Sequence, residues 1–415
     1  MRAFAEFLKA LPVFRSLKHP GVMAITLAAA GILMITMGMR QSIGLYVSPI
    51  NTSTGLGIVT LSLALAVGQF VWGAIQPVAG ALADRHGPRG VLLGGVLLMA
   101  LASAITPFMS SGLGLAITLG VMSAAGSGAA SFSVLIGAAA QRLPAEARGT
   151  ASGVINAGGS FGQFVFAPII QKLIQSLGWM GAMWTTALLT LAALPLVGKL
   201  TASTHATQTH PEPDTGLRQA LRDAFADRSY WLLHAGFFTC GFHIAFLVTH
   251  LPGEVNLCGL PPSVASWSLA IIGLANILGS LYAGSAVTKY RSKHVLAWMY
   301  GSRAALVIAY LLLPKTEWTF YVFAAGLGFT WLATVPPTAT LVGKLFGARY
   351  LATLFGMTLL SHQIGGFMGA WLGGLAITHF GDYNWMWYAD IVLAAGAALV
   401  NLPIREKPMP RLAAA

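Results

Sequence analysis

Three ionisable side chains stand inside long apolar stretches of this sequence: Arg40, His243 and His362. A guanidinium can hold a carboxylate through two parallel hydrogen bonds, and an imidazole can take up or release a proton near neutral pH. Ionisable groups are costly in apolar surroundings, so each of the three is a candidate for a functional role. The chemistry that they favour is the binding of an anion, together with proton transfer.

Arg40 lies in MGMRQSIGLYVSPI, roughly 28 Å along an apolar stretch of about 45 Å at 1.5 Å per residue. Its side chain could face a cavity and bind an anion, extend to the outer end of the stretch, or bond to a backbone carbonyl. Among the acidic residues only Asp390 is clearly embedded, and it is expected near the outer end of its own stretch. Since no acid is placed to neutralise Arg40, an anionic substrate is favoured over a cationic one.

The histidines supply groups that titrate near neutrality, and His243, His250 and His362 are placed for proton coupling. His250 follows His243 by two helical turns and shares its face. His362 lies in TLLSHQIGGFMGAWLGG, where glycines recur every four residues and permit close helix packing. Each imidazole has the alternative role of a packing residue with a satisfied hydrogen bond.

Amide side chains complete the candidate set. Asn156 and Gln163 share a helix face two turns apart and could line a cavity, and Gln69 and Gln76 are further polar candidates. Asn276 could hydrogen-bond a substrate or, as the alternative, hold two helices together.

The sequence offers no catalytic constellation and no cofactor motif. The two cysteines, Cys240 and Cys258, form neither a CxxC metal site nor a disulfide framework. No nucleophile is paired with a base, and no GxxxxGK[ST] loop for phosphates is present. We therefore expect no enzymatic activity, no metal and no cofactor.

The elements that carry these residues are apolar segments of about 20 residues, each able to cross a hydrocarbon core of about 30 Å. With 56% hydrophobic and 9% charged residues over 415 positions, the chain is far too apolar for a soluble domain. Because backbone groups in lipid must pair within their own segment, we expect an all-α integral membrane protein. The predicted transmembrane spans are 21–50, 57–82, 90–108, 113–140, 149–171, 179–198, 231–251, 263–288, 294–313, 318–341, 350–378 and 385–403.

The basic residues indicate the orientation of the chain. A formal net charge of +12 could suggest nucleic acid, but 20 of the 24 Lys and Arg residues fall in alternate loops on one side. By the positive-inside rule that side is the cytoplasm, and only Lys172 and Lys315 fall outside. We therefore expect a bacterial-type inner membrane with both termini cytoplasmic, and no nucleic-acid partner.

Residues 199–230 interrupt the apolar rhythm with a linker rich in Pro, Thr and charge, which ends in a short amphipathic segment. The linker separates an N-terminal six-helix bundle, 1–198, from a C-terminal one, 231–415. At a separation of 203 residues, matching residues recur in the first and fifth spans of each half, which predicts an internal duplication. The matched pairs include Gly38 with Gly241, Arg40 with His243, Gly162 with Gly365, and Phe164 with Phe367.

The loop between the second and third spans reads GALADRHGPRG, with Gly80, Asp84, Arg85, Gly87 and Arg89 in a distinctive order. Glycine permits a tight turn and a close helix approach, and Asp84 can pair with a basic residue or with a helix N-terminus. Such a pair would latch one conformation. The alternative is an ordinary turn whose charged residues only follow the membrane topology. The order resembles the cytoplasmic loop signature of the major facilitator superfamily. The second half carries only a degenerate copy of this signature, without the acidic residue.

This resemblance covers the whole chain and implies two pseudo-symmetric six-helix bundles that alternate access around a site at the midplane. The eleventh span, with His362, and the glycine-rich fifth span resemble the bacterial monocarboxylate and oxalate/formate branch, in which the equivalent eleventh-span position contacts the anion. The eighth-span Asp and Arg of the animal members align with Asn276 and Ser280 here, so the proton relay does not carry over. The resemblance also makes the ninth span peripheral, so a structural role is expected for Arg303.

We therefore expect a secondary transporter, monomeric in the bilayer, that moves a small organic anion of the monocarboxylate type with proton coupling. Arg40 and His362 are the leading anion contacts. The alternative is an efflux pump for hydrophobic drugs or metabolites, driven by proton antiport. An export pump would commonly need an embedded acid, and such acids are scarce in this sequence.

Overall fold

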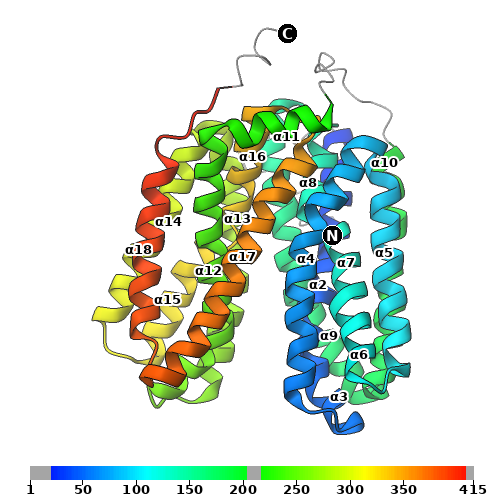
Figure 1. The fold of residues 1–415 in the computed structure, drawn as a ribbon, viewed down its shortest axis with the longest axis vertical. Helices are drawn as coiled ribbons and strands as arrows, with labels where there is room; N and C mark the ends of the chain where they lie inside the picture. Colours follow the sequence, from blue (N-terminus) through cyan, green and yellow to red (C-terminus); the bar gives the residue numbers. More distant parts are fainter. Residues whose placement is uncertain (1–19, 203–215, 408–415) are drawn as a thin grey trace. The chain divides into compact units, whose positions relative to one another are not determined.

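The computed structural model describes residues 20–202 and 216–407, and every regular element in these ranges is a helix (Figure 1). Helices satisfy all backbone hydrogen bonds within a segment, as a hydrocarbon surrounding demands. The all-α prediction is therefore confirmed. Five basic residues that the topology prediction counted as cytoplasmic lie outside the described residues: Arg2, Lys9, Arg15, Lys18 and Arg411.

The chain divides into two compact units. Unit 1 comprises residues 1–211 and 348–356, and unit 2 comprises residues 212–347 and 357–415. The sequence placed the boundary in the linker 199–230. Segment 348–356 is the one part of the second half that clusters with unit 1.

Unit 1 contains the helices of the first six expected spans, several of them in pieces. The chain bends at Gly178 within α9, where φ is 69° and ψ is 170°, so that α9 is two helices joined at a glycine. Its parts correspond to the expected fifth and sixth spans. The elements are α2 (Pro20–Gln41), η2 (Ile43–Tyr46), α3 (Val47–Thr54), α4 (Ile58–His86), α5 (Pro88–Ile105), η3 (Thr106–Phe108), α6 (Gly112–Leu115), η4 (Ala116–Ser123), α7 (Ala124–Ala129), α8 (Phe132–Ala140), α9 (Ala145–Leu191) and α10 (Leu194–Ala202).

Unit 2 begins with α11, the expected short amphipathic helix, in which Arg218 and Arg222 are exposed while Ala224 is buried. The last long pair of helices includes α17, whose first residues up to Gly356 belong to unit 1. The elements are α11 (Leu217–Ala226), α12 (Arg228–Leu257), α13 (Pro262–Lys289), α14 (Ser292–Leu312), α15 (Glu317–Thr330), α16 (Val335–Phe346), α17 (Leu351–Phe380) and α18 (Asn384–Asn401).

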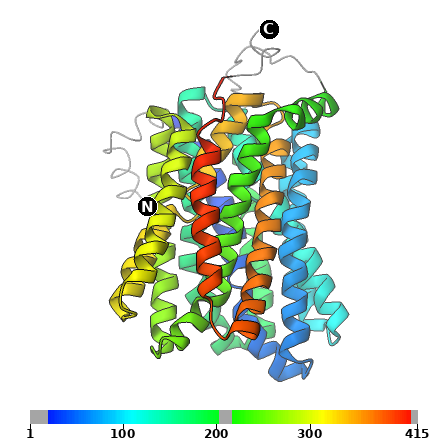
Figure 2. The ribbon, with the colours of Figure 1, turned by 60° about the vertical axis from the view of Figure 1, so that its left-hand side comes forward.

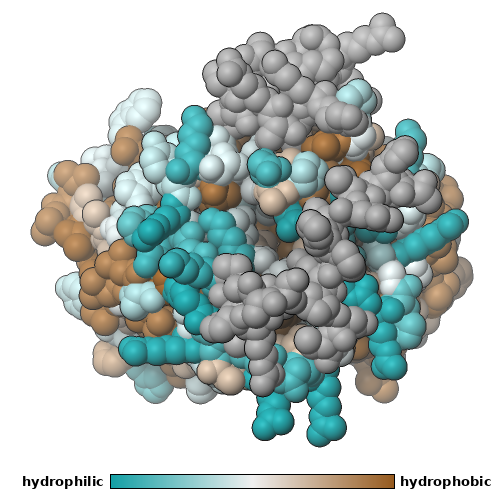
Figure 3. Space-filling view, turned by 90° about the horizontal axis from the view of Figure 1, so that it is seen from above, coloured by the Kyte–Doolittle hydropathy of each residue, from teal (hydrophilic) through white to brown (hydrophobic). Residues whose placement is uncertain are grey.

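Among the described residues, nine helical stretches are long and apolar enough to cross a membrane. They coincide with nine of the expected spans. The other three expected spans, 149–171, 350–378 and 385–403, are helical in α9, α17 and α18 but do not belong to these nine. Large apolar side chains are exposed along the helices, as hydrocarbon permits and water does not. In the end-on view of Figure 3, hydrophilic residues gather on the end face and hydrophobic residues lie at its rim.

One long span in each unit is broken, and the breaks correspond. In unit 1 the break separates α7 from α8, and in unit 2 it separates α15 from α16. Ser131 in the first break and Thr334 in the second are 203 residues apart, the same separation as Arg40 and His243. This correspondence supports the internal duplication that the sequence predicted.

Each break leaves backbone carbonyls without a helical partner, and side chains of the first span of the same unit contact them. Thr36 on α2 donates its hydroxyl to the carbonyl of Ala130, at 3.0 Å. Cys240 on α12 places Sγ 3.7 Å from the carbonyl of Trp331. The two units therefore support their broken helices from the same side of the bundle.

Four glycines bring the first and fifth spans of each unit into backbone contact. They are Gly38 and Gly162 between α2 and α9, and Gly241 and Gly365 between α12 and α17. A Cβ atom on any of the four would collide with a backbone carbonyl of the partner helix. These are residues that the sequence comparison matched between the halves, so the duplicated pattern encodes a close helix seam.

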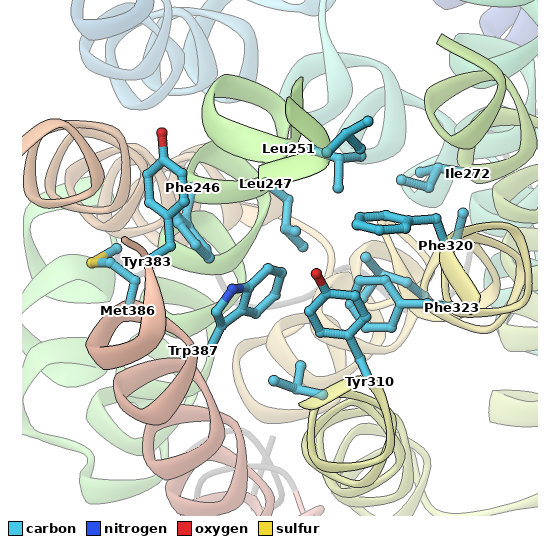
Figure 4. Packing of buried hydrophobic residues seen from close by; sticks show 14 of the residues in the cluster. Phe246, Leu247, Leu251, Ile272, Tyr310, Phe320, Phe323, Tyr383, Met386 and Trp387 are labelled. Atoms are coloured by element: carbon cyan, nitrogen blue, oxygen red, sulfur yellow. The ribbon is translucent and has the colours of Figure 1, made fainter. Parts of the chain in front are cut away.

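Aromatic side chains fill the core of unit 2 (Figure 4). The ring of Trp387 on α18 lies 4.9 Å from Tyr310 on α14 and 5.0 Å from Phe246 on α12, measured between ring centres. The hydroxyl of Tyr310 donates to Glu254 Oε1 at 2.6 Å, which satisfies a polar group that the core buries. The cluster joins six helices of unit 2: α12, α13, α14, α15, α17 and α18.

The glycine seam makes a testable prediction. Gly365→Val places a branched side chain against the carbonyl of Phe238 and should lower the free energy of unfolding by about 1–3 kcal/mol or more. Thermal denaturation of the purified protein in detergent, followed by size-exclusion chromatography, measures the loss. Gly273→Val on α13 is the matched control, because a Cβ there has no atom within 4 Å. Equal melting temperatures for the two variants would contradict the proposed packing role.

Candidate functional site

Arg40 lies in the last turn of α2, and α4 holds its side chain. Its Nη2 donates to Gln69 Oε1, and its guanidinium carbon lies 4.5 Å from the centre of the Trp72 ring. Trp72 is buried and Gln69 is exposed, so the guanidinium lies between the interior of unit 1 and one of its surfaces. The amide and the ring orient the cation without cancelling its charge.

The charge of Arg40 is not neutralised within the described residues, where no carboxylate forms an ion pair with it. Of the five N–H donors that a guanidinium carries, one is used in the hydrogen bond to Gln69. A half-buried cation with spare donors in a fixed plane has the properties that a carboxylate ligand requires. The sequence identified Gln69 as a polar candidate, and it missed Trp72, which only its spacing from Gln69 along α4 could have suggested.

The two amides on α9 do not line a common surface. Asn156 is buried, with 1% of its surface exposed, whereas Gln163 is exposed. Gln76 is fully buried and accepts a hydrogen bond from Ser131 at 3.3 Å, at the break between α7 and α8. Gln76 therefore supports a helix break, and only Gln163 of the α9 pair is open to a ligand.

Asp84 binds the start of α17. Its Oδ2 accepts hydrogen bonds of 2.7 Å from both the backbone N–H and the hydroxyl of Thr353, and its Oδ1 accepts one of 3.1 Å from Gln141. Gln141 also donates to the carbonyl of Arg349 at 3.1 Å. A carboxylate at a helix N-terminus meets unpaired N–H groups and the positive end of the helix dipole. The geometry matches the helix-terminus alternative for Asp84.

Of the other residues in the loop signature, the glycines shape α4 near this contact, and the two arginines take no part in it. A Cβ atom on Gly80 would collide with the carbonyl of Ala352, so the glycine lets α4 approach segment 348–356. Gly87 has φ of 87° and ends α4 in a conformation that other residues rarely adopt. Arg85 and Arg89 are exposed, which fits the topological role of their charges.

In unit 2, His243 Nδ1 on α12 contacts Asp390 Oδ2 on α18, which makes a buried imidazole–carboxylate pair. Both side chains are fully buried. The sequence had placed Asp390 near the outer end of its span and had given it no partner. Helices α12, α17 and α18 run side by side around this pair (Figure 2).

His362 on α17 is 7% exposed, and neither of its ring nitrogens has a hydrogen-bond partner among the described residues. Its ring packs 4.9 Å from that of Phe237. Asn276 accepts a hydrogen bond of 2.9 Å from the N–H of Leu332, at the break between α15 and α16. That bond matches the helix-packing interpretation of Asn276, whereas the polar neighbour of His362 is the weakly hydrogen-bonding thiol of Cys240.

Arg303 is fully buried on α14 and stabilises the same break. Its Nη2 donates to the carbonyls of Thr330 at 2.6 Å and Trp331 at 3.1 Å. The arginine therefore has the structural contacts that the sequence interpretation favoured. Within residues 20–202 and 216–407, no group of three or more His, Cys, Asp or Glu side chains could hold a metal ion.

Long apolar helices that hold ionisable side chains inside their bundles are typical of membrane transport proteins. The sequence model of the Major Facilitator Superfamily matches residues 26–370 and 254–415, and the chain belongs to this superfamily. It is a multi-pass membrane transporter with the twelve-helix fold in two halves that the sequence predicted.

Two curated relatives match most of the chain. Monocarboxylate transporter 13 of Rattus norvegicus is 25% identical over 356 residues, which cover 82% of this chain and 78% of the relative. The oxalate:formate antiporter of Oxalobacter formigenes is 23% identical over 397 residues, which cover 94% of this chain and 91% of the relative. The predicted resemblance to the monocarboxylate and oxalate/formate branch is confirmed.

Solved structures share the fold. The proton:xylose symporter XylE, bound to 6-bromo-6-deoxy-D-glucose, has a TM-score of 0.74 at 16% identity, covering 95% of this chain and 98% of that structure. The transporter FucP in the outward conformation has a TM-score of 0.71 at 16% identity, covering 93% of this chain and 99% of that structure. At this identity the similarity establishes the fold alone.

The contacts of Asp84 make a second prediction. Asp84→Ala leaves the N–H and hydroxyl of Thr353 without their acceptor and should cost about 1–3 kcal/mol in the free energy of unfolding. Thr353→Val removes only the hydroxyl bond and should cost less. Thermal denaturation in detergent ranks the two variants, with Glu146→Ala as a control that removes an exposed carboxylate. A smaller loss for Asp84→Ala than for Thr353→Val would reject the capping role.

Proposed function

We propose that this protein is a secondary active transporter that moves a small organic anion, a monocarboxylate, across the inner membrane by alternating access with proton coupling. The observation that carries the proposal is the guanidinium of Arg40, held by Gln69 and Trp72 with no carboxylate paired to it. An anionic substrate would supply the missing charge and occupy the spare donors. The names of two relatives, a monocarboxylate transporter and an oxalate:formate antiporter, point to the same class of substrate.

His362 on α17 is the second residue that we propose as an anion contact. Its support is chemical: a nearly buried imidazole with no hydrogen-bond partner among the described residues can donate to a carboxylate. Gln163 is the remaining exposed candidate from α9. We further propose that Asp84 and Thr353 latch one conformation of the transport cycle, with Gly80 permitting their approach.

The orientation proposed for the chain has both termini in the cytoplasm and a monomer as the working unit. Its support is the distribution of basic residues, since Arg85, Arg89, Arg218 and Arg222 are all exposed in loops or at helix ends on the same predicted side. A gradient of protons or of exchanged anions supplies the energy.

Export of hydrophobic compounds is the second candidate function. The sequence argument against it was a shortage of embedded acids, and Asp390 is such an acid, fully buried in unit 2. A buried acid is the group through which proton antiport would operate. The two functions differ in the direction of transport and in the charge of the substrate.

Uptake by reconstituted protein tests the proposal. Proteoliposomes with an imposed inward proton gradient should accumulate labelled small carboxylates. Arg40→Ala should reduce kcat/KM for uptake by about 10–100-fold, the worth of a charge-assisted hydrogen bond, and Arg40→Lys should retain part of it. Lys172→Ala, which removes an exposed cation of α9, is the matched control and should transport normally. Wild-type kinetics in Arg40→Ala would reject the anion site, and gradient-driven efflux of hydrophobic compounds without carboxylate uptake would favour the export pump.

His362→Gln tests the second contact. The amide keeps a donor but cannot carry a positive charge, so KM for the carboxylate should rise by about tenfold while the protein stays folded. Counterflow exchange at several carboxylate concentrations measures KM without a proton gradient. An unchanged KM would remove His362 from the anion site.

A further inference from the structure

The contact between His243 and Asp390 is the most deeply buried imidazole–carboxylate or salt-bridge contact among the described residues. Histidine Nδ1 contacts carboxylate Oδ2, and neither side chain has any exposed surface. Such a pair is expensive inside a membrane bundle, because each ionised group loses its hydration. Two apolar side chains could hold α12 and α18 together at lower cost, so the pair calls for a role beyond packing.

Charged and titratable groups surround the pair. Arg303 on α14 lies near enough to act electrostatically on both His243 and Cys240, and Tyr300 is one turn before Arg303 on the same helix. His362 contributes a second imidazole from α17. From the break between α15 and α16, the ring of Trp331 lies 6.2 Å from that of His243.

The remaining helices against α12 contribute few ionisable groups at this level. The basic residues of α13 and α16, Lys289 and Lys344, lie in the last turns of those helices. Asp390 is therefore the carboxylate that faces His243, and Arg303 is the fixed cation nearest to it.

The pair leaves polar atoms unused. Asp390 Oδ1, His243 Nε2 and the Nε and Nη1 atoms of Arg303 are buried with no hydrogen-bond partner among the described residues. A structural ion pair normally satisfies the atoms that it buries. Here each partner keeps one polar atom without a hydrogen bond, as a site that gains and loses a proton requires.

The charge of the cluster fits one exchangeable proton. Arginine stays protonated in proteins, so an ionised Asp390 balances Arg303 when the imidazole is neutral. An added proton converts His243 into an imidazolium, which the adjacent carboxylate stabilises. The cluster thus alternates between a neutral state and a singly positive state.

We propose that His243 and Asp390 form a proton-binding site inside unit 2, distinct from the anion contact at Arg40. The proton comes from water on one side of the membrane, binds the imidazole–carboxylate pair, and returns to water on the other side. No bond between heavy atoms forms or breaks. This inference rests on the proposed proton coupling and assigns it to specific residues.

The glycine seam links this site to α17. Gly241, two residues before His243, packs against the carbonyl of His362, and Gly365 packs against the carbonyl of Phe238. Because the two backbones are in contact, a shift of α12 on protonation of His243 displaces α17 as well. The proton site is thereby connected to the helix that carries the second proposed anion contact.

The other two histidines of α12 have neutral partners. His234 Nδ1 lies 2.7 Å from the hydroxyl of Ser361, and His250 Nε2 lies 2.8 Å from the carbonyl of Ala370. A neutral partner stabilises an imidazolium much less than a carboxylate does. This difference makes His234 the matched control for His243.

The test measures proton movement and carboxylate exchange on the same proteoliposomes. A pH-sensitive dye is trapped inside, a carboxylate is added outside, and exchange of labelled against unlabelled carboxylate is followed separately. Asp390→Asn and His243→Gln should each reduce substrate-driven acidification by at least about tenfold while exchange stays within a few-fold of wild type. His234→Gln should acidify as wild type does. Normal acidification in a folded Asp390→Asn or His243→Gln variant overturns the proposal.

A substrate-free measurement separates this inference from the proposed function. If the wild-type protein neither takes up nor exchanges carboxylates, the proposed function fails, and proton binding is decided by titrating the purified protein from neutral pH down to the lowest pH at which it stays folded. The wild type should bind about one proton more per chain than His243→Gln across that range, and His234→Gln should match the wild type. Equal proton counts for the wild type and His243→Gln overturn the proton site whatever the substrate is.

Discussion

An ionised side chain surrounded by hydrocarbon has to be balanced from within the protein, and this requirement decides where the polar residues of this chain lie. Arg303 donates to carbonyls that a helix break releases, and Asp390 is paired with an imidazole. Arg40 is different, because an amide and an aromatic face orient its guanidinium without cancelling its charge. The contacts of Arg303 and Asp390 hold helices of unit 2 together, whereas a cation without a paired carboxylate is where an anionic ligand gains most by binding.

The second constraint is the approach of helix backbones. Without a hydrophobic drive between helices in lipid, association depends on close van der Waals contact, which small residues allow. Gly38 and Gly162 provide it in unit 1, and Gly241 and Gly365 provide it in unit 2. The same tight seam brings His243 and His362 onto neighbouring backbones. Packing and chemistry are therefore coupled through positions that carry no functional group at all.

Most of the fold could be predicted from the sequence, because apolar length and the alternation of basic loops are local signals. The breaks could not. The span 318–341 was predicted as continuous, although Pro336 and Pro337 mark the start of a new helix after the gap at 331–334. The break near Ser131 has no proline and only small residues around it, so its sequence signal is weaker still.

Side-chain partnerships were harder to predict than helices, for a physical reason. His243 and Asp390 are 147 residues apart, and Asp84 and Thr353 are 269 apart, so no periodicity within one helix relates them. The sequence identified the chemistry of His243 and Asp84 from their types and surroundings. Their partners depend on how helices distant in the chain pack together, which a single sequence does not contain.

The broken spans also determine where each unit can bend. A continuous helix is stiff along its whole length, whereas two short helices in line can change their relative angle at the break between them. In unit 1 a threonine hydroxyl contacts the break at Ala130. In unit 2 a guanidinium and a thiol contact the break at Trp331. The hydrogen bond from the guanidinium is charge-assisted and is therefore the stronger contact. We therefore expect the broken span of unit 1 to bend more easily at its break than the broken span of unit 2.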